Sequence, residues 1–212
     1  QPEVNRLLVE LYRVLAHAVI AAEFPRTQAV VATRMIDVVP QGLWQGELTC
    51  EKTPAVVVAL ARAGLLPSQV IFDFLNQVLD PAGVRQDHLA LGRTIDTQGH
   101  VTGAGLYASK IGGPVDQAML LIPDPMGATG STVSRVLNHY AKEVQGQPKK
   151  VLATGGRALS GPDGRAEMCD FDYFVTDPLG EVLGGRALLS WGRAHLRRRS
   201  IRPFASLLDI GA

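Results

Sequence analysis

The segment from Leu120 to Thr132, with the sequence L-L-I-P-D-P-M-G-A-T-G-S-T, carries the residues best suited to chemistry. An apolar run ends at Asp124, a turn of small residues follows, and a helix-like pattern begins near Ser131. A carboxylate at a strand end can accept hydrogen bonds from two vicinal hydroxyls, such as those of a ribose. Backbone N–H groups in the first turn of a helix can hold an anion, because that end carries about half a positive charge. The segment therefore predicts a site for a phosphorylated sugar.

Small and hydroxylated side chains fill the turn itself. Gly127, Ala128 and Gly130 allow a ligand to approach the backbone closely. The hydroxyl donors there are Thr129, Ser131 and Thr132. The alternative is an ordinary strand–turn–helix connection with a Ser or Thr cap, since small residues are common in such turns. The pattern is neither a Walker A loop nor a dinucleotide-binding G-x-G-x-x-G.

Apolar runs and helical patterns alternate along the chain on both sides of this segment. The expected strands are residues 55–61, 84–91, 106–111, 117–122 and 150–153, and the expected helices are 4–22, 67–79 and 131–144. This alternation predicts an α/β fold with a mainly parallel twisted sheet, covered by helices on both faces. Ligands of such sheets bind beyond the carboxyl ends of the strands, where we expect Arg62, Arg93 and Asp124.

Residues 27–53 and the region from residue 151 onward fit this alternation of strands and helices less well. Residues 27–39 are compatible with a helix or a strand, and residues 42–53 suggest a short hairpin or arm that includes Trp44. The V-L-A-T-G-G sequence at 151–156 is expected to be a strand end and a turn, and turn-forming residues interrupt the pattern beyond it.

We expect a single domain over residues 1–212. Its parts are an N-terminal helix and arm (1–53), a core (about 54–155) and a divergent hood or C-terminal region (156–212).

Composition narrows the classes of protein to which the chain can belong. Its 212 residues carry a formal net charge of +1, so a general affinity for nucleic acid is not expected. No window holds about 18 uninterrupted apolar residues, and no membrane-spanning helix is expected. Residues 1–6 lack the basic-then-apolar order of a signal peptide, which favours a cytoplasmic protein.

Histidines and cysteines show no spacing typical of metal ligands. The five histidines form neither HxxxH nor HExxH, so we expect no metal held by the protein itself. Cys50 and Cys169 are expected to be reduced thiols, with a disulfide as the alternative. The basic segment at 193–203 is expected to be a solvated helix end or tail; an anionic ligand, an acidic neighbouring subunit or RNA are the alternatives.

Four motifs, in the same order along the chain, resemble those of uracil phosphoribosyltransferases, which belong to the type I phosphoribosyltransferases. D-P-M-G-A-T-G-S-T at 124–132 resembles the family's phosphoribosyl-pyrophosphate loop, D-P-M-[LG]-A-T-G-G-S. A-R-A-G-L at 61–65 resembles L-R-A-G-L after an apolar strand. L-A-L-G-R-T at 89–94 resembles I-G-L-Y-R, and L-Y-A-S-K-I at 106–111 resembles Y-Y-x-K-L-P. Together the matches span about residues 54–140.

The resemblance implies a type I phosphoribosyltransferase-like fold with a small hood or arm. It implies transfer of a phosphoribosyl group from phosphoribosyl pyrophosphate (PRPP) to uracil, giving UMP and pyrophosphate. Arg62 and Arg93 match the arginines that hold the pyrophosphate, Asp124 matches the acid on the ribose hydroxyls, and residues 128–132 match the 5-phosphate cradle. The whole implied PRPP-binding set is Arg62, Arg93, Asp124, Pro125, Met126, Gly127, Ala128, Thr129, Gly130, Ser131 and Thr132.

The implied reaction needs positioning and charge neutralisation more than a nucleophilic side chain. Its transition state resembles an oxocarbenium ion, and the leaving pyrophosphate must be stabilised. Asp124 is therefore the one residue expected to take part in catalysis. Mg²⁺ is expected to accompany the pyrophosphate, held largely by the substrate. The family's assembly implies a homodimer or a larger homo-oligomer.

Departures from the family pattern leave the base and the activity open. Ser131 stands where the family has a second Gly. The segment Y-F-V-T-D-P-L-G-E-V-L-G-G-R at 173–186 matches the family's base-binding segment, Y-I-x-P-G-L-G-D-A-G-D-R, after a one-residue insertion. Phe174, Gly180 and Glu181 would then contact uracil; the alternative is an unrelated turn and strand. The other functions considered are a weak or inactive regulatory protein that binds a nucleotide or PRPP, and a phosphoribosyltransferase for another base.

Overall fold

The structure is a computed structural model that describes the backbone of residues 2–95, 97–98, 101–125, 131–160, 166–176 and 182–190. Side chains are described over residues 2–92, 94, 97–98, 105–125 and 132–155. In chain order the elements are α1 (Pro2–Glu23), β1 (Arg26–Ala32), β2 (Leu43–Thr49), β3 (Ala55–Ala61), α2 (Leu65–Val78), a 3-10 turn (Pro81–Gly83), β4 (Val84–Ile95), β5 (Val101–Lys110), β6 (Met119–Pro123), α3 (Ser131–Glu143), β7 (Lys150–Ser160), β8 (Ala166–Thr176) and β9 (Val182–Ser190).

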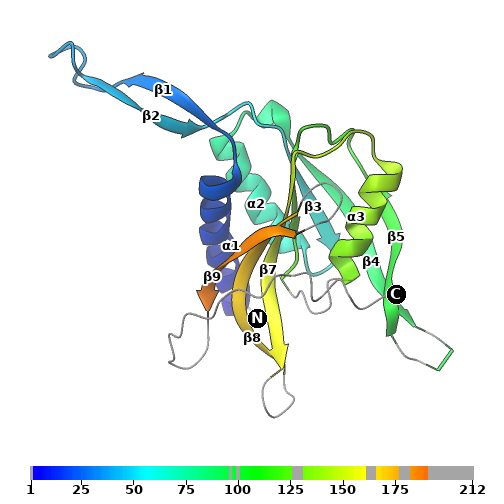
Figure 1. Ribbon diagram of the computed structural model, residues 1–212. Helices are drawn as coiled ribbons and strands as arrows, with labels where there is room; N and C mark the ends of the chain where they lie inside the picture. The colour runs from blue at the N-terminus through cyan, green and yellow to red at the C-terminus, as the bar shows by residue number, and fades with distance from the viewer. Residues whose placement is uncertain are drawn as a thin grey trace.

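The larger sheet has a parallel centre and antiparallel edges. Its strand order is β5-β4-β3-β6-β7-β8-β9 (Figure 1). The pairs β4–β3, β3–β6 and β6–β7 are parallel, whereas β5, β8 and β9 join antiparallel. This arrangement confirms the predicted α/β class and the parallel pairing of the core strands. The antiparallel edges make the sheet more mixed than the sequence pattern predicted.

Helices cover both faces of the sheet, as predicted. α1 and α2 lie on one face, and α3 lies on the other (Figure 1). β3 shows the reason in its sequence, because every one of its first six residues is apolar and buried. Alternate side chains therefore serve two cores: Val57 packs with α1 and α2, while Val58 packs on the side of α3.

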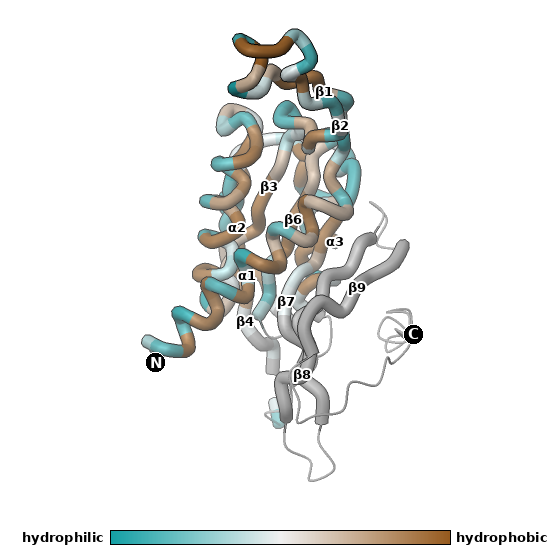
Figure 2. Tube along the Cα trace, turned by 90° about the vertical axis from the view of Figure 1, so that its left-hand side faces the viewer, coloured by the Kyte–Doolittle hydropathy of each residue, from teal (hydrophilic) through white to brown (hydrophobic). Residues whose placement is uncertain are grey.

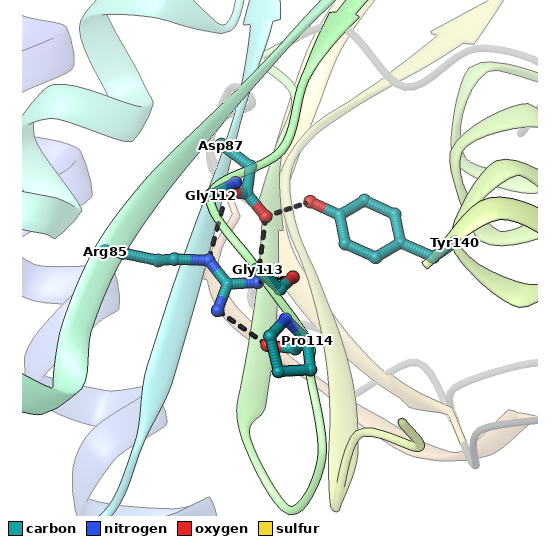
Figure 3. Close-up of polar contacts among 6 residues, drawn as sticks. All are labelled: Arg85, Asp87, Gly112, Gly113, Pro114 and Tyr140. Carbon is teal, nitrogen blue, oxygen red and sulfur yellow. Dashed lines mark hydrogen bonds and ion pairs between the residues drawn. The ribbon is translucent and has the colours of Figure 1, made fainter. Parts of the chain in front are cut away.

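A buried carboxylate ties α3 to β4 (Figure 3). Asp87 on β4 is fully buried and accepts hydrogen bonds from Arg85 Nε at 3.1 Å, the Gly112 N–H at 2.9 Å and the Tyr140 hydroxyl at 2.8 Å. Arg85 also donates to the carbonyls of Gly113 and Pro114. Because the carboxylate is both paired and hydrogen-bonded, its burial is compensated. Burial first, and then the charge of Asp87, raise the pKa of Tyr140.

The strands β1 and β2 form an antiparallel hairpin that reaches away from the sheet (Figure 1). Residues 42–53, predicted to form a short hairpin or arm, supply one strand of this hairpin, β2. The other strand, β1, lies at the start of residues 27–39, for which a helix and a strand were both considered. Figure 2 shows hydrophobic residues along this hairpin and at its tip. Its exposed large apolar residues are Val30, Val31, Met35, Val38, Val39, Leu43, Trp44 and Leu48.

Several strands run further than the apolar pattern predicted. β4 continues to Ile95, β5 begins at Val101, and β7 continues to Ser160. The expected turn within residues 151–156 is therefore wrong, because both glycines of that segment lie inside β7. The physical reason is the neighbouring β8, which pairs with β7 from Val151 to Ser160 and supplies hydrogen-bond partners that an isolated strand end would lack.

Candidate functional site

The carboxyl ends of the parallel strands bring the predicted residues to one edge of the sheet. Arg62 follows β3, and Asp124 follows β6. Arg93 was expected at a strand end but lies inside β4, where it pairs with Ala104. It still lies beyond the end of β3, because Ala61 is level with Ala90. The backbones of all three residues therefore lie at or beyond the carboxyl ends of β3 and β6, while the Arg93 side chain lies outside the described residues.

The turn that carries Arg62 packs against the end of β6. The Ala61–Arg62 peptide is cis, and the Arg62 side chain is exposed. The Gly64 N–H donates to the Leu60 carbonyl at 2.9 Å. A Cβ at Gly64 would lie 2.8 Å from the Pro123 carbonyl oxygen, so the close packing of this turn requires glycine. Gly64, two residues after Arg62, therefore packs directly against the end of β6, the strand that precedes Asp124.

Asp124 is held between β7 and α1. Its N–H donates to the Thr154 carbonyl at 2.8 Å, which extends the pairing of β6 and β7 by one residue. At Gly155, a Cβ would overlap with the Asp124 carbonyl and would lie 3.3 Å from the Tyr12 hydroxyl. Burial first, and then the negative charge of Asp124, raise the pKa of Tyr12. The half-buried Asp124 therefore has a buried phenol from the first helix as a neighbour.

The N-terminus of α3 follows the predicted phosphate loop. α3 begins at Ser131, as predicted, and its first turn contains no acidic residue. Thr132 is half-buried on that turn, and Pro125 is buried at the start of the loop. An anion at this end of the helix would meet a positive dipole with no neighbouring carboxylate in the same turn.

The remaining predicted site residues are described in part or not at all. The loop residues Met126, Gly127, Ala128, Thr129 and Gly130, together with Gly180 and Glu181, lie outside the described residues. The backbone of Phe174 lies in β8, opposite Ala153 of β7 and Gly185 of β9. Ala153 directly precedes Thr154, whose carbonyl binds Asp124, so the structure places the Phe174 backbone near the candidate edge.

Two neighbours of Asp124 were not predicted as site residues. Tyr12 lies on a buried helical face with Leu8, Leu15 and Val19, where a hydroxyl among aliphatic side chains could have signalled a polar role. Gly155 was attributed to a turn. Neither sequence feature identifies Asp124 as the neighbouring residue, because the contacts of Tyr12 and Gly155 with Asp124 join segments that are far apart in the sequence.

The part of the chain that the structure describes contains neither a metal-binding cluster nor a membrane-spanning helix. There, no group of three or more His, Cys, Asp or Glu side chains comes together in a way that could hold a metal ion. Over the same residues, no helix has the length and apolarity needed to cross a membrane. The Cys50 thiol is free.

Comparison with known proteins gives one local sequence relative. A uracil phosphoribosyltransferase of Methanococcus maripaludis (strain C7) is 43% identical over 61 residues, which cover 27% of this chain and 24% of that protein. The matched segment thus spans about a quarter of the length of this relative. No protein-family model matches the chain.

Solved structures of phosphoribosyltransferases resemble the chain at low sequence identity. A purine phosphoribosyltransferase from Pyrococcus horikoshii is 14% identical, with a TM-score of 0.41, over 68% of this chain and 70% of that one. A hypoxanthine phosphoribosyltransferase from Staphylococcus aureus is 10% identical, with a TM-score of 0.45, over 76% and 67%. The Trypanosoma cruzi hypoxanthine enzyme, in complex with its product IMP, is 11% identical, with a TM-score of 0.41, over 77% and 70%.

Proposed function

We propose that this protein is a phosphoribosyltransferase that transfers the phosphoribosyl group of PRPP to a nucleobase, with uracil as the base. The observation that carries the proposal is the placement of Asp124. This residue directly follows β6, the Arg62 turn packs against the end of the same strand, and the D-P-M-G-A-T-G-S-T segment leads from it into α3. A ribose at Asp124 would thus have an arginine-bearing turn on one side and a helix N-terminus on the other.

Each part of PRPP then has its proposed partner. Arg62 and Arg93 neutralise the pyrophosphate as it leaves, Asp124 accepts hydrogen bonds from the ribose hydroxyls, and residues 128–132 hold the 5-phosphate. Charge-assisted hydrogen bonds to the leaving group stabilise the separated charges of an oxocarbenium-like transition state. Mg²⁺ bound to the pyrophosphate would be held largely by the substrate and would spread the charge of the leaving group.

The choice of uracil as the base rests on similarities in short segments of the sequence. The Asp-Pro-Met form of the loop resembles uracil enzymes, and the local sequence relative is named as one. Phe174, Gly180 and Glu181 are the proposed base-binding residues. The position of the Phe174 backbone opposite Ala153 supports a place for Phe174 near the ribose site.

The test is pyrophosphate release from PRPP and Mg²⁺ with a panel of bases that includes uracil, hypoxanthine, guanine and adenine. Turnover with uracil alone supports the full proposal, and turnover with a purine corrects the base. Binding of PRPP without turnover of any base favours the regulatory alternative. An Arg62→Ala variant should lose most of the pyrophosphate release, and Arg6→Ala, which removes an exposed arginine on α1, should not.

We also propose a homodimer in which the hairpin arm covers part of a second copy. Val31 pairs with Trp44, Leu48 lies on the same face of the hairpin, and the Trp44 ring lies over Gly46. A two-stranded hairpin is at best marginally stable by itself in water, so an arm with this apolar face gains stability from a partner surface.

A further inference from the structure

Tyr12 is a polar residue in an otherwise apolar part of the core. Its side chain is fully buried, among Leu15, Ala16 and Val19 of the same helix. Burying a hydroxyl costs free energy unless a polar group accompanies it, and phenylalanine would fill the same space without that cost. The presence of tyrosine here therefore calls for a polar partner at the tip of the ring.

The tip of the ring lies at the candidate ribose site. A Cβ at Gly155 would lie 3.3 Å from the Tyr12 hydroxyl and would overlap with the Asp124 carbonyl, so α1, β7 and the end of β6 meet at this point. The neighbouring Thr154 is also buried, and its carbonyl binds the Asp124 N–H. The Tyr12 hydroxyl, on the N-terminal helix, thus lies beside the backbone of Asp124, the residue proposed to bind ribose.

We propose that the Tyr12 hydroxyl orients the Asp124 carboxylate toward the ribose hydroxyls, which makes Tyr12 a positioning residue of the PRPP site. This inference rests on the proposed function. It is not part of the motif resemblance, which begins near residue 54 and does not include α1.

The protonation of Tyr12 suits a donor. A phenol with the ordinary pKa of 10.0 already keeps its proton at neutral pH, and here burial and the charge of Asp124 raise the pKa of Tyr12 further. A protonated phenol can donate one hydrogen bond, and an ionised carboxylate has about four acceptor positions. One acceptor position can therefore be used to fix the carboxylate while the others remain for the sugar.

A second buried tyrosine provides the matched control. Tyr140 also carries a buried hydroxyl beside a carboxylate, but its partner is Asp87 in the Arg85 network (Figure 3). Tyr12→Phe and Tyr140→Phe each remove one hydroxyl and keep the ring. If tyrosine hydroxyls matter for packing and stability alone, the two variants should behave alike toward ligands.

The experiment compares ribose 5-phosphate with 2-deoxyribose 5-phosphate, which makes it independent of the base. Dissociation constants are measured by calorimetry for the wild type and both variants, with PRPP and Mg²⁺ as the reference ligand. We expect the wild type to prefer ribose 5-phosphate by about tenfold or more. Tyr12→Phe should reduce that preference by about threefold to tenfold, whereas Tyr140→Phe should leave it unchanged.

Three results would overturn the inference. A Tyr12→Phe protein that binds PRPP and keeps the wild-type preference shows that Tyr12 does not position Asp124. Equal losses in both variants show a general packing effect. A wild type that binds none of the three ligands refutes the proposed function and the inference with it, and this outcome is distinguishable because it appears before any substitution. Melting curves confirm that both variants are folded.

Discussion

The hydroxyl of Tyr140 donates a 2.8 Å hydrogen bond to the buried carboxylate of Asp87, and this bond joins α3 to β4. α3 is the helix whose first turn is proposed to hold a phosphate. A network at the other end of that helix therefore anchors it to the sheet, away from the ligand.

Removing Asp87 should destabilise the protein strongly. Asp87→Ala leaves the Arg85 guanidinium and the Tyr140 hydroxyl without their shared acceptor, and we expect a loss of about 3–5 kcal/mol in the free energy of unfolding. Tyr140→Phe should cost about 1.5–3 kcal/mol, because it removes one hydrogen bond to a charged group. Urea denaturation measures both. A cost for Asp87→Ala no larger than that of an exposed substitution such as Asp73→Ala would contradict this role.

Both buried tyrosines should make the folded state sensitive to alkali. Their pKa values are raised above the ordinary value of 10.0, so the folded state holds these protons more tightly than the unfolded state. Their contribution to stability is complete below pH 10 and is lost as pH rises above it, by about 1.4 kcal/mol per pH unit for each tyrosine.

The measurement is urea unfolding of the wild type and of a Tyr12→Phe, Tyr140→Phe double variant between pH 9 and pH 11.5. Because lysines titrate in the same range, the informative quantity is the difference between the two slopes. The double variant should lose stability less steeply with rising pH. Parallel curves would mean that the phenols ionise as readily in the folded protein as in the unfolded chain.

Gly155 should not tolerate a larger side chain. In Gly155→Ala the new Cβ would overlap with the backbone carbonyl of Asp124, so β7 and the end of β6 must move apart. We expect a loss of about 1–3 kcal/mol in stability and a PRPP affinity at least about tenfold weaker, since Asp124 is displaced.

Gly83→Ala is the matched control for this substitution, because the nearest atom to a Cβ there is 3.7 Å away. Stability is read from chemical denaturation, and affinity from calorimetry with PRPP and Mg²⁺. Equal behaviour of the two alanine variants in both measurements would show that Gly155 has no special relation to Asp124.

The arm can be tested one face at a time. Val31 lies on the face that carries Trp44 and Leu48, whereas Val30 lies on the other face, opposite Gln45. If the apolar face covers a second copy, Val31→Asp should shift the protein toward monomer in sedimentation velocity, and Val30→Asp should leave the dimer in place. A wild type that sediments as a monomer at all concentrations would refute the dimer.

The elements of the core could be predicted because their signals are local. β3 has the predicted bounds, since its apolar run is continuous and ends at Arg62. α3 begins where the small-residue turn ends. β8 was not predicted, and a strand near β9 appeared only in the alternative interpretation of residues 173–186. Glycines and charged residues interrupt the alternation there, and the strand character of this region depends on the pairing of β8 with β7 and of β9 with β8.

The same distinction between local and tertiary signals applies to the candidate site. Arg62 and Asp124 follow strands whose ends can be read from the sequence, so their meeting at one edge could be predicted from parallel pairing. The contact of Tyr12 with this edge could not, because it depends on how α1 crosses the sheet. The spacing of residues along the sequence does not predict how α1 packs across the sheet.

The most direct test of the proposed PRPP site is a calorimetric titration of PRPP and Mg²⁺ into the wild type and into Asp124→Asn. The substitution keeps the shape of the half-buried side chain and removes its charge. We expect the wild type to bind PRPP and Asp124→Asn to bind it at least about tenfold more weakly, with an unchanged melting temperature. Equal affinities, or a folded wild type that does not bind PRPP, would contradict the proposed site.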